Sequence, residues 1–337
     1  MRNTILGLVA VIVLGGAAFY LIQQNQASDS IRDIELERNF TVDKKSDIKG
    51  LIVTPKKTPP YRLDLVDGVW YLNNSIKASK HVVESILQVF TKVEMDHIPT
   101  KAASDKVRQA IKENGINVQL LGKNGKVMKT VWIGSDASFG KGTHMMMDGA
   151  TQPYVMALPL ITGGFRPRFT YEFDRIRDKK IISYEADDIN SIQVVYPKDQ
   201  SKSFKVVNND GAYTVETATD FQEKSSQPLN VNRARAYIEG LTSISVEGWD
   251  NFNEKQDSIR GLIPFAEISI DLKEGNDRQI GLYPFNDFLD AKVHIDEWEQ
   301  SKYITRYFVT LENGQFAIGQ QRVLKELLRP YEHFFSE

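Results

Sequence analysis

The chain of 337 residues has the composition of a folded globular protein, with 41% hydrophobic and 26% charged residues. Its 42 basic side chains are balanced by 44 acidic ones, and a formal net charge of −2 provides no field that would attract a nucleic acid. Cysteine is absent, which excludes disulfides, thiolate catalysis, thiolate metal sites and a lipidated cysteine. The length is sufficient for two domains with separate cores.

An uncharged stretch from Thr4 to Ile22 predicts how the chain is held in place. As a helix it would be roughly 28 Å long, which matches the hydrocarbon core of a bilayer, so we expect one membrane span. A cleaved signal peptide is the alternative, but the apolar run is longer than in such signals and no small-x-small cleavage site follows it. Arg2 precedes the span and the next basic residue is Arg32, which favours a cytoplasmic N-terminus and a periplasmic body at a bacterial inner membrane.

The chain beyond the span alternates between strand and helix patterns. Residues 61–72 alternate in polarity around an Asp-Gly turn, which predicts a hairpin. A helix with one apolar stripe is expected after Ser79, and a second helix is expected between a cap at Ser104 and a stop at Gly115. Residues 116–133 then predict another hairpin around Asn-Gly.

The same order of elements occurs a second time. The hairpin pattern of 204–215 matches the first hairpin, Asn230 is expected to cap a helix, and 266–283 repeats the later hairpin. A last helix is predicted over Val323–Leu328, before Pro330. We therefore predict an α+β fold made of two tandem repeats, each a meander or hairpin plus helix, with mixed, mainly antiparallel sheets.

The predicted organisation has five parts. They are a transmembrane anchor over 1–27, a spacer over 28–45, a first α+β repeat over 46–162, a charged connector over 163–186 and a second α+β repeat over 187–337.

Three segments carry a resemblance to a known family: GTHMMMDGATQPYVMALP, RDKKIISYEADDINSIQV and GLIPFAEISIDL. They are similar to a membrane-anchored bacterial envelope family, common in Bacteroidota, that is catalogued as a domain of unknown function. The resemblance covers essentially the whole chain. It implies a partner, because members are often encoded beside a gliding-type ABC transporter and its auxiliary subunit. It implies no activity and supplies no catalytic residues.

The segment from Gly134 to Thr143, GSDASFGKGT, suggests a phosphate-binding P-loop but has the wrong spacing. A P-loop has four residues between its glycines and Ser or Thr directly after its Lys, and it opens a helix. Here Gly142 follows Lys141, and the next residues have the pattern of a strand. We therefore predict a crossing between strands and no nucleotide site.

Metal and catalytic patterns are equally weak. His144 followed by three methionines suggests a soft metal, but in a strand the central sulfur points away from its neighbours. His294 with Asp296 and Glu297 is a second sparse cluster. No G-x-S-x-G elbow is present, and sequence alone does not place the paired carboxylates at one cleft. We predict no catalytic, cofactor or metal residues.

Arg166 and Arg168 follow a Gly-Gly pair in the connector. Guanidinium groups and glycine amides together bind carboxylates and phosphates, so these arginines are candidate anion contacts. The competing interpretation is a connector whose arginines form internal salt bridges.

These observations favour a membrane-tethered, periplasmic binding or assembly module without enzymatic activity and with no bound cofactor. The resemblance adds an ABC transporter or another envelope complex as the partner. Two alternatives stay open: an envelope enzyme that acts on glycan or peptide through clustered carboxylates, such as Asp187 with Asp188 or Glu297 with Glu299, and a carrier of an apolar ligand.

Overall fold

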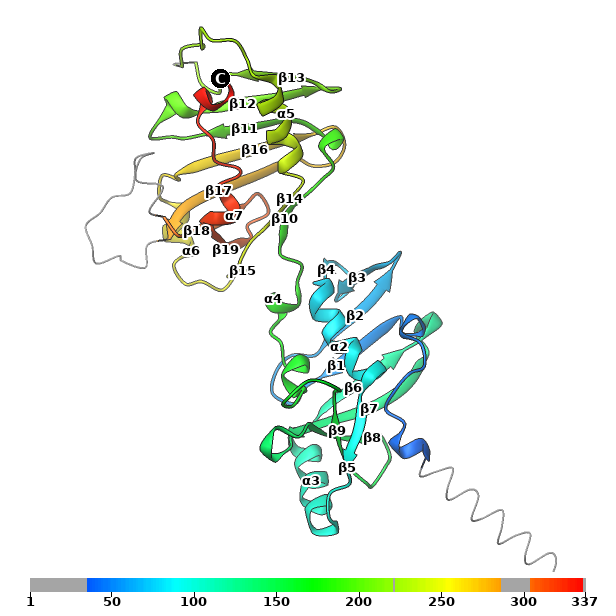
Figure 1. Cartoon of the computed structure of the whole chain (residues 1–337). Helices are drawn as coiled ribbons and strands as arrows, with labels where there is room; N and C mark the ends of the chain where they lie inside the picture. The colour runs from blue at the N-terminus through cyan, green and yellow to red at the C-terminus, as the bar shows by residue number, and fades with distance from the viewer. Residues whose placement is uncertain (1–34, 221, 286–303, 336–337) are drawn as a thin grey trace, which may run out of the picture. The chain divides into compact units, whose positions relative to one another are not determined.

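The computed structural model describes residues 35–220, 222–285 and 304–335 (Figure 1). The chain divides between Asp178 and Lys179 into two compact units, called unit 1 and unit 2. The predicted span from Thr4 to Ile22 and the His294 cluster lie outside the described residues. Within the described ranges no helix is long and apolar enough to cross a membrane.

Unit 1 is a nine-stranded antiparallel sheet with helices α2 and α3. Its elements are η1 Lys45–Asp47, β1 Gly50–Thr54, β2 Tyr61–Val66, β3 Val69–Leu72, β4 Ile76–Lys77, α2 Lys80–Lys92, β5 Glu94–His97, α3 Lys101–Asn114, β6 Ile116–Leu121, η2 Lys123–Gly125, β7 Val127–Asp136, η3 Ser138–Gly140, β8 Thr143–Met147, β9 Tyr154–Ala157, η4 Arg166–Phe169 and α4 Phe173–Ile176.

Unit 2 contains an eight-stranded antiparallel sheet and a small two-stranded sheet. Its elements are β10 Lys180–Ser183, η5 Ala186–Asp188, β11 Ile189–Val195, η6 Gln200–Lys202, β12 Phe204–Asn209, β13 Ala212–Glu216, α5 Val231–Gly240, β14 Ser243–Ser245, β15 Gly248–Trp249, α6 Gln256–Arg260, β16 Ala266–Leu272, β17 Arg278–Phe285, β18 Arg306–Leu311, β19 Phe316–Gln320, α7 Gln321–Leu324 and η8 Tyr331–Phe334.

The two large sheets have the same order of strands. The order β3-β2-β1-β6-β7-β8-β9-β5 in unit 1 corresponds, strand for strand, to β13-β12-β11-β16-β17-β18-β19-β15 in unit 2. The registers also correspond, since Leu51 of β1 lies between Leu63 and Leu120, and Ile192 of β11 lies between Val206 and Ile270. Corresponding positions in the two units can therefore be compared residue by residue.

One helix covers a face of each sheet (Figure 1). α2 buries its apolar stripe, which includes Val83, Ile86 and Phe90, in the core of unit 1. α5 buries Ala234, Tyr237 and Ile238 in the core of unit 2. Complete burial of an aliphatic or aromatic side chain contributes about 1.5–3 kcal/mol, so these stripes hold the helices on their sheets.

Most predicted helix and hairpin positions are confirmed, and two predictions are wrong. The second helix is capped by Thr100, whose Oγ1 accepts from the Ala103 amide at 3.4 Å, and Ser104 is buried inside the helix, where its hydroxyl donates to the Pro99 carbonyl. The Lys-Ala-Ala run after Thr100 favours helix, so the helix begins one turn earlier than predicted. The last predicted helix is only the short α7, because turns follow Leu324.

The charged segment predicted as the connector contributes apolar residues to both cores. Phe165, Phe169 and Ile176 are buried in unit 1, and Ile181 and Ile182 are buried in unit 2. The charged residues of the segment lie between these buried positions. The average composition of the segment is therefore charged, and it does not reveal the buried apolar residues.

Residues Leu327–Phe334, called the closing segment, complete the core of unit 2. The Phe334 ring packs against Phe204 and Tyr237 with ring centroids 4.9 and 5.5 Å apart. The Tyr237 hydroxyl donates to the Leu327 carbonyl at 2.8 Å, and the Asn230 amide donates to the Phe334 carbonyl at 2.8 Å. The segment is therefore both packed and hydrogen-bonded to α5.

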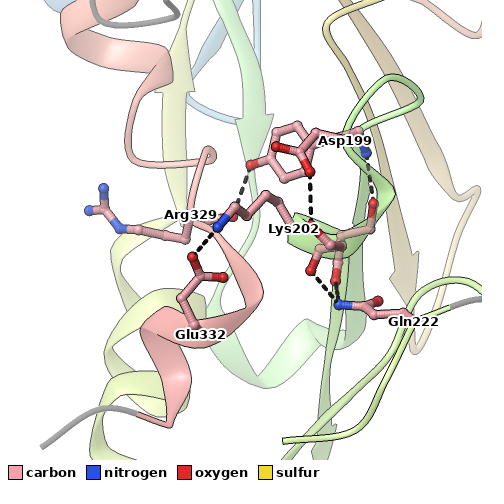
Figure 2. Close-up of polar contacts among 8 residues, drawn as sticks. Asp199, Lys202, Gln222, Arg329 and Glu332 are labelled. Carbon is pink, nitrogen blue, oxygen red and sulfur yellow. Dashed lines mark hydrogen bonds and ion pairs between the residues drawn. The ribbon is translucent and has the colours of Figure 1, made fainter. Parts of the chain in front are cut away.

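Polar contacts also connect the closing segment to the rest of unit 2 (Figure 2). Lys202 forms an ion pair with Glu332, and the Tyr196 hydroxyl donates to the Arg329 carbonyl at 2.9 Å. Gln222 Nε2 donates to the carbonyls of Ser201 and Ser203 at 2.9 and 2.6 Å. All of these side chains are engaged within unit 2, so this cluster is structural.

We predict that Phe334→Ala destabilises unit 2 by about 3–5 kcal/mol, the usual cost of truncating a buried phenylalanine. Denaturant unfolding of the full chain, followed by tryptophan fluorescence and circular dichroism, measures the change. Phe252→Ala is the control: that side chain is 88% exposed, and its removal should change the unfolding free energy by less than about 0.5 kcal/mol. Equal effects of the two substitutions would contradict the assigned role.

Candidate functional site

A depression of about 310 Å³ lies at one corner of unit 1, where the ends of three central strands meet. We call it the basic depression. Its lining comes from the start of β1, the end of β2 and the turn between β6 and β7: Lys49, Arg62, Asp64, Leu65, Val66, Leu121, Gly122, Lys123, Asn124 and Gly125. The sheet therefore gathers residues that are far apart in the sequence.

The only carboxylate in this lining is bound to an arginine. Arg62 Nε and Nη2 donate to the two oxygens of Asp64 at 2.7 and 2.8 Å, a bidentate pair. The Asp64 carboxylate raises the pKa of Arg62 through this hydrogen bond. Among the described residues no carboxylate lies within ion-pair distance of Lys49 or Lys123, so neither lysine of the lining has an ion-pair partner there.

Unit 1 has a glycine at this corner, where unit 2 has a large side chain. Gly122 stands two residues after Leu120, and Leu272, its counterpart two residues after Ile270, is packed in the core of unit 2. A Cβ atom on Gly122 would lie 3.0 Å from Cγ of Met128, so the Met128 side chain lies directly over this glycine.

A buried asparagine closes the corresponding corner of unit 2. Asn208 corresponds to Leu65 and is 2% exposed. Its Nδ2 donates to the carbonyls of Ala186 and Ile189 at 3.2 and 3.1 Å, and its Oδ1 accepts from the Gly211 amide at 2.9 Å. These bonds fasten η5 and the hairpin turn to the strand end, which leaves a filled corner.

The electrostatics of the two corners also differ. In unit 2, Lys273 forms an ion pair with Asp210 at 2.7 Å. The hydrogen bond with Asp210 raises the pKa of Lys273, with further contributions from Asp187 and Asp188, and the same hydrogen bond lowers the pKa of Asp210. The lysine of unit 2 is thus neutralised, whereas Lys123, its counterpart in unit 1, lines an open depression without an acidic partner in the described part of the chain.

This arrangement suits binding of an anionic group. Lysine ammonium groups attract phosphate and carboxylate without a rigid geometry, and glycine at the turn lets a ligand approach the backbone. Acid-base catalysis would require a carboxylate or imidazole that is free to exchange a proton, and Asp64, the carboxylate in the lining, is held by Arg62.

The predicted anion contacts lie elsewhere in unit 1 and bind backbone carbonyls. Arg166 Nη1 donates to Ile133 and Gly134 at 3.0 and 2.7 Å, and its Nη2 donates to Asn114 at 2.7 Å. Arg168 Nη1 donates to the Ser85 carbonyl at 2.6 Å. Burial lowers the pKa of both guanidinium groups. These bonds fasten η4 to α2, α3 and β7, and the anion contact remains a prediction.

The P-loop-like segment joins β7 to β8, and no helix follows it directly. β8 contains His144, whose Nδ1 lies 2.9 Å from the Ser135 carbonyl oxygen, and the buried Met145 and Met146. Asp188, one of the paired carboxylates, accepts from the Glu185 amide in a capping box of η5. Within the described residues, no group of three or more His, Asp or Glu is arranged to hold a metal ion.

Sequence reasoning did not single out Lys49 or Lys123. Both stand in polar segments that contain further lysines, and such residues are usually solvated. The signal that could have found them is the comparison of the repeats, because Gly122 replaces a leucine at a core position and Leu65 replaces an asparagine.

A family model described as a domain of unknown function (DUF4340) matches residues 70–262, more than half of the chain and parts of both units. No curated protein and no solved structure gives a significant match.

We predict that Asn208→Ala destabilises unit 2 by about 1–3 kcal/mol, because it removes three hydrogen bonds at a buried position. Asn209→Ala is the matched control, since the neighbouring asparagine is exposed and its loss should change stability by less than about 0.5 kcal/mol. Denaturant unfolding of the two variants provides the comparison, and a neutral Asn208→Ala would show that the corner is not closed by this side chain.

Proposed function

The chain belongs to the family described as a domain of unknown function (DUF4340), and from this premise we propose that it is a membrane-tethered binding or assembly module of the bacterial envelope. The observation that carries the proposal is the open basic depression of unit 1, with Lys49 and Lys123 free to bind an anionic group. The uncharged stretch from Thr4 to Ile22 supplies the tether, and its flanking charges favour a periplasmic body.

We further propose that the module comes from a bacterium of the Bacteroidota type and is accessory to an ABC transporter or another envelope complex. The support is the resemblance in the segments around residues 142–159, 177–194 and 261–272. The tandem organisation agrees with the matching strand order of the two sheets. An envelope enzyme or a carrier of an apolar ligand stays a prediction, and no contact in the described residues favours either.

Lysine footprinting tests the location and the occupancy together. Spheroplasts that express the full chain are treated with a membrane-impermeant amine reagent, and each lysine is quantified by mass spectrometry. If the body is periplasmic, the exposed Lys224 of unit 2 is modified without lysis. If the depression is occupied in the envelope, Lys49 and Lys123 are modified several-fold less in spheroplasts than in the detergent-solubilised chain, because a bound anionic group shields an ammonium group.

Two outcomes would contradict the proposal. Protection of Lys224 until the cells are lysed would show that the body is cytoplasmic. Equal reactivity of Lys49 and Lys123 before and after solubilisation would show that nothing covers the depression in the envelope.

The partner is tested by affinity purification of the full chain from membranes in mild detergent. We expect the same envelope complex, with ABC transporter subunits, in repeated preparations. A tagged version of the isolated span, residues 1–45, is the control for capture by the anchor alone. Recovery of the chain without any envelope protein, or equal recovery with the isolated span, would contradict an assembly role for the two units.

A further inference from the structure

Three exposed apolar side chains adjoin the basic depression. Val66, Val127 and Met128 are 51%, 47% and 39% exposed. Val66 lines the depression, Val127 pairs with Leu121 at its edge, and Met128 lies over Gly122. Val66 ends β2, and Val127 and Met128 begin β7, so all three lie at the same end of the sheet as Lys49 and Lys123.

The fold does not require apolar residues at these positions. In the corresponding corner of unit 2, the residue that ends β12 is Asn209, and the turn before β17 contains Asn276 and Asp277. Both corners have the same strands in the same order. Unit 2 has polar residues at these positions, so the fold does not need apolar ones there. Exposed aliphatic side chains that the fold does not need indicate an interaction surface.

The charges at this end of the sheet favour an anionic partner. Lys49, Lys123 and Lys126 are exposed, and among the described residues no carboxylate lies within ion-pair distance of them. Arg62 and Asp64 neutralise each other, and the exposed Asp47 and Asp67 leave the corner with a small positive excess. Lysines next to exposed aliphatic groups are typical of surfaces that lie in a bilayer interface, where the ammonium groups reach lipid phosphates.

The position of the corner along the chain is consistent with such a surface. Lys49 lies two residues after the end of η1, and unit 1 is the first folded unit after the predicted span and spacer. The corner consists of strand ends and hairpin turns, including the Asp67-Gly68 turn with positive φ at both residues. Turns at the ends of strands can enter a lipid surface while the strands themselves stay paired in the sheet. No long row of unpaired backbone groups is then exposed to the lipid.

We propose that this corner of unit 1 rests on an anionic lipid surface, with Val66, Val127 and Met128 at the acyl boundary and Lys49, Lys123 and Lys126 at the lipid phosphates. The inference deepens the proposed function and rests on its tether, since it names the lipid headgroup as the anionic group at the depression.

The test uses the absence of cysteine, which permits a single label on the full chain. An environment-sensitive fluorophore is attached to Val127→Cys, and the protein is reconstituted into nanodiscs of phosphatidylcholine with or without phosphatidylglycerol. Lipids with a quencher on the acyl chain report contact with the bilayer. Asn276→Cys, at the equivalent turn of unit 2, is the matched control.

We expect the label at position 127 to shift to the blue and to be quenched at least about two-fold more strongly when phosphatidylglycerol is present, because anionic lipids attract the lysines. The label at position 276 should show neither change. Lys49→Glu with Lys123→Glu in the labelled chain should abolish the quenching, and Val66→Cys should reproduce the result at an independent position.

The tether and the lipid-facing corner can be tested separately. Co-elution with nanodiscs reports the tether, and quenching reports the corner. Co-elution without quenching at position 127, or equal quenching at positions 127 and 276, overturns the lipid-facing corner and leaves the tether intact. Quenching by added vesicles without stable co-elution supports the corner and overturns the tether. If neither is seen, both are wrong.

Discussion

The register of three central strands determines what can stand at the corner of each unit. β1 lies between β2 and β6, and β11 lies between β12 and β16. A slip of one residue would turn buried side chains such as Leu51 or Ile192 outward, so each register is strongly specified. The strand ends and hairpin turns consequently meet at equivalent places in the two sheets, and a side chain can change there without a change in the sheet.

The two corners show two uses of this scaffold. Unit 2 fills its corner with Leu272 and Asn208 and neutralises Lys273 with Asp210. Unit 1 has Gly122 and Leu65 at these positions, and its Lys123 lines an open depression. The filled corner serves stability, because its polar groups are hydrogen-bonded to one another. The open corner has lysines and exposed aliphatic side chains instead, and these are the groups on which the proposed lipid contact rests.

Sequence periodicity predicted the α+β class, the central hairpins and the helices after Ser79 and Asn230, because long periodic segments and Asp-Gly turns are strong local signals. It misplaced the start of the second helix, since both Thr100 and Ser104 are acceptable caps and only packing decides between them. Short strands such as β15 have too few residues to show a period. Local sequence patterns could not predict the basic depression, because its lysines come from different strand ends and only the folded sheet brings them together.

The closing segment implies an order of folding for the two units. Every buried element of unit 1 lies before Lys179, so its sheet can be completed as soon as that part of the chain is available. Unit 2 must wait for Phe334, and its Tyr196 hydroxyl bonds to a carbonyl 133 residues further along the chain. During synthesis, which proceeds from the N-terminus, unit 1 is therefore a finished body while the sheet of unit 2 still exposes the site of an absent phenylalanine ring. During that interval unit 2 is most vulnerable to aggregation and proteolysis.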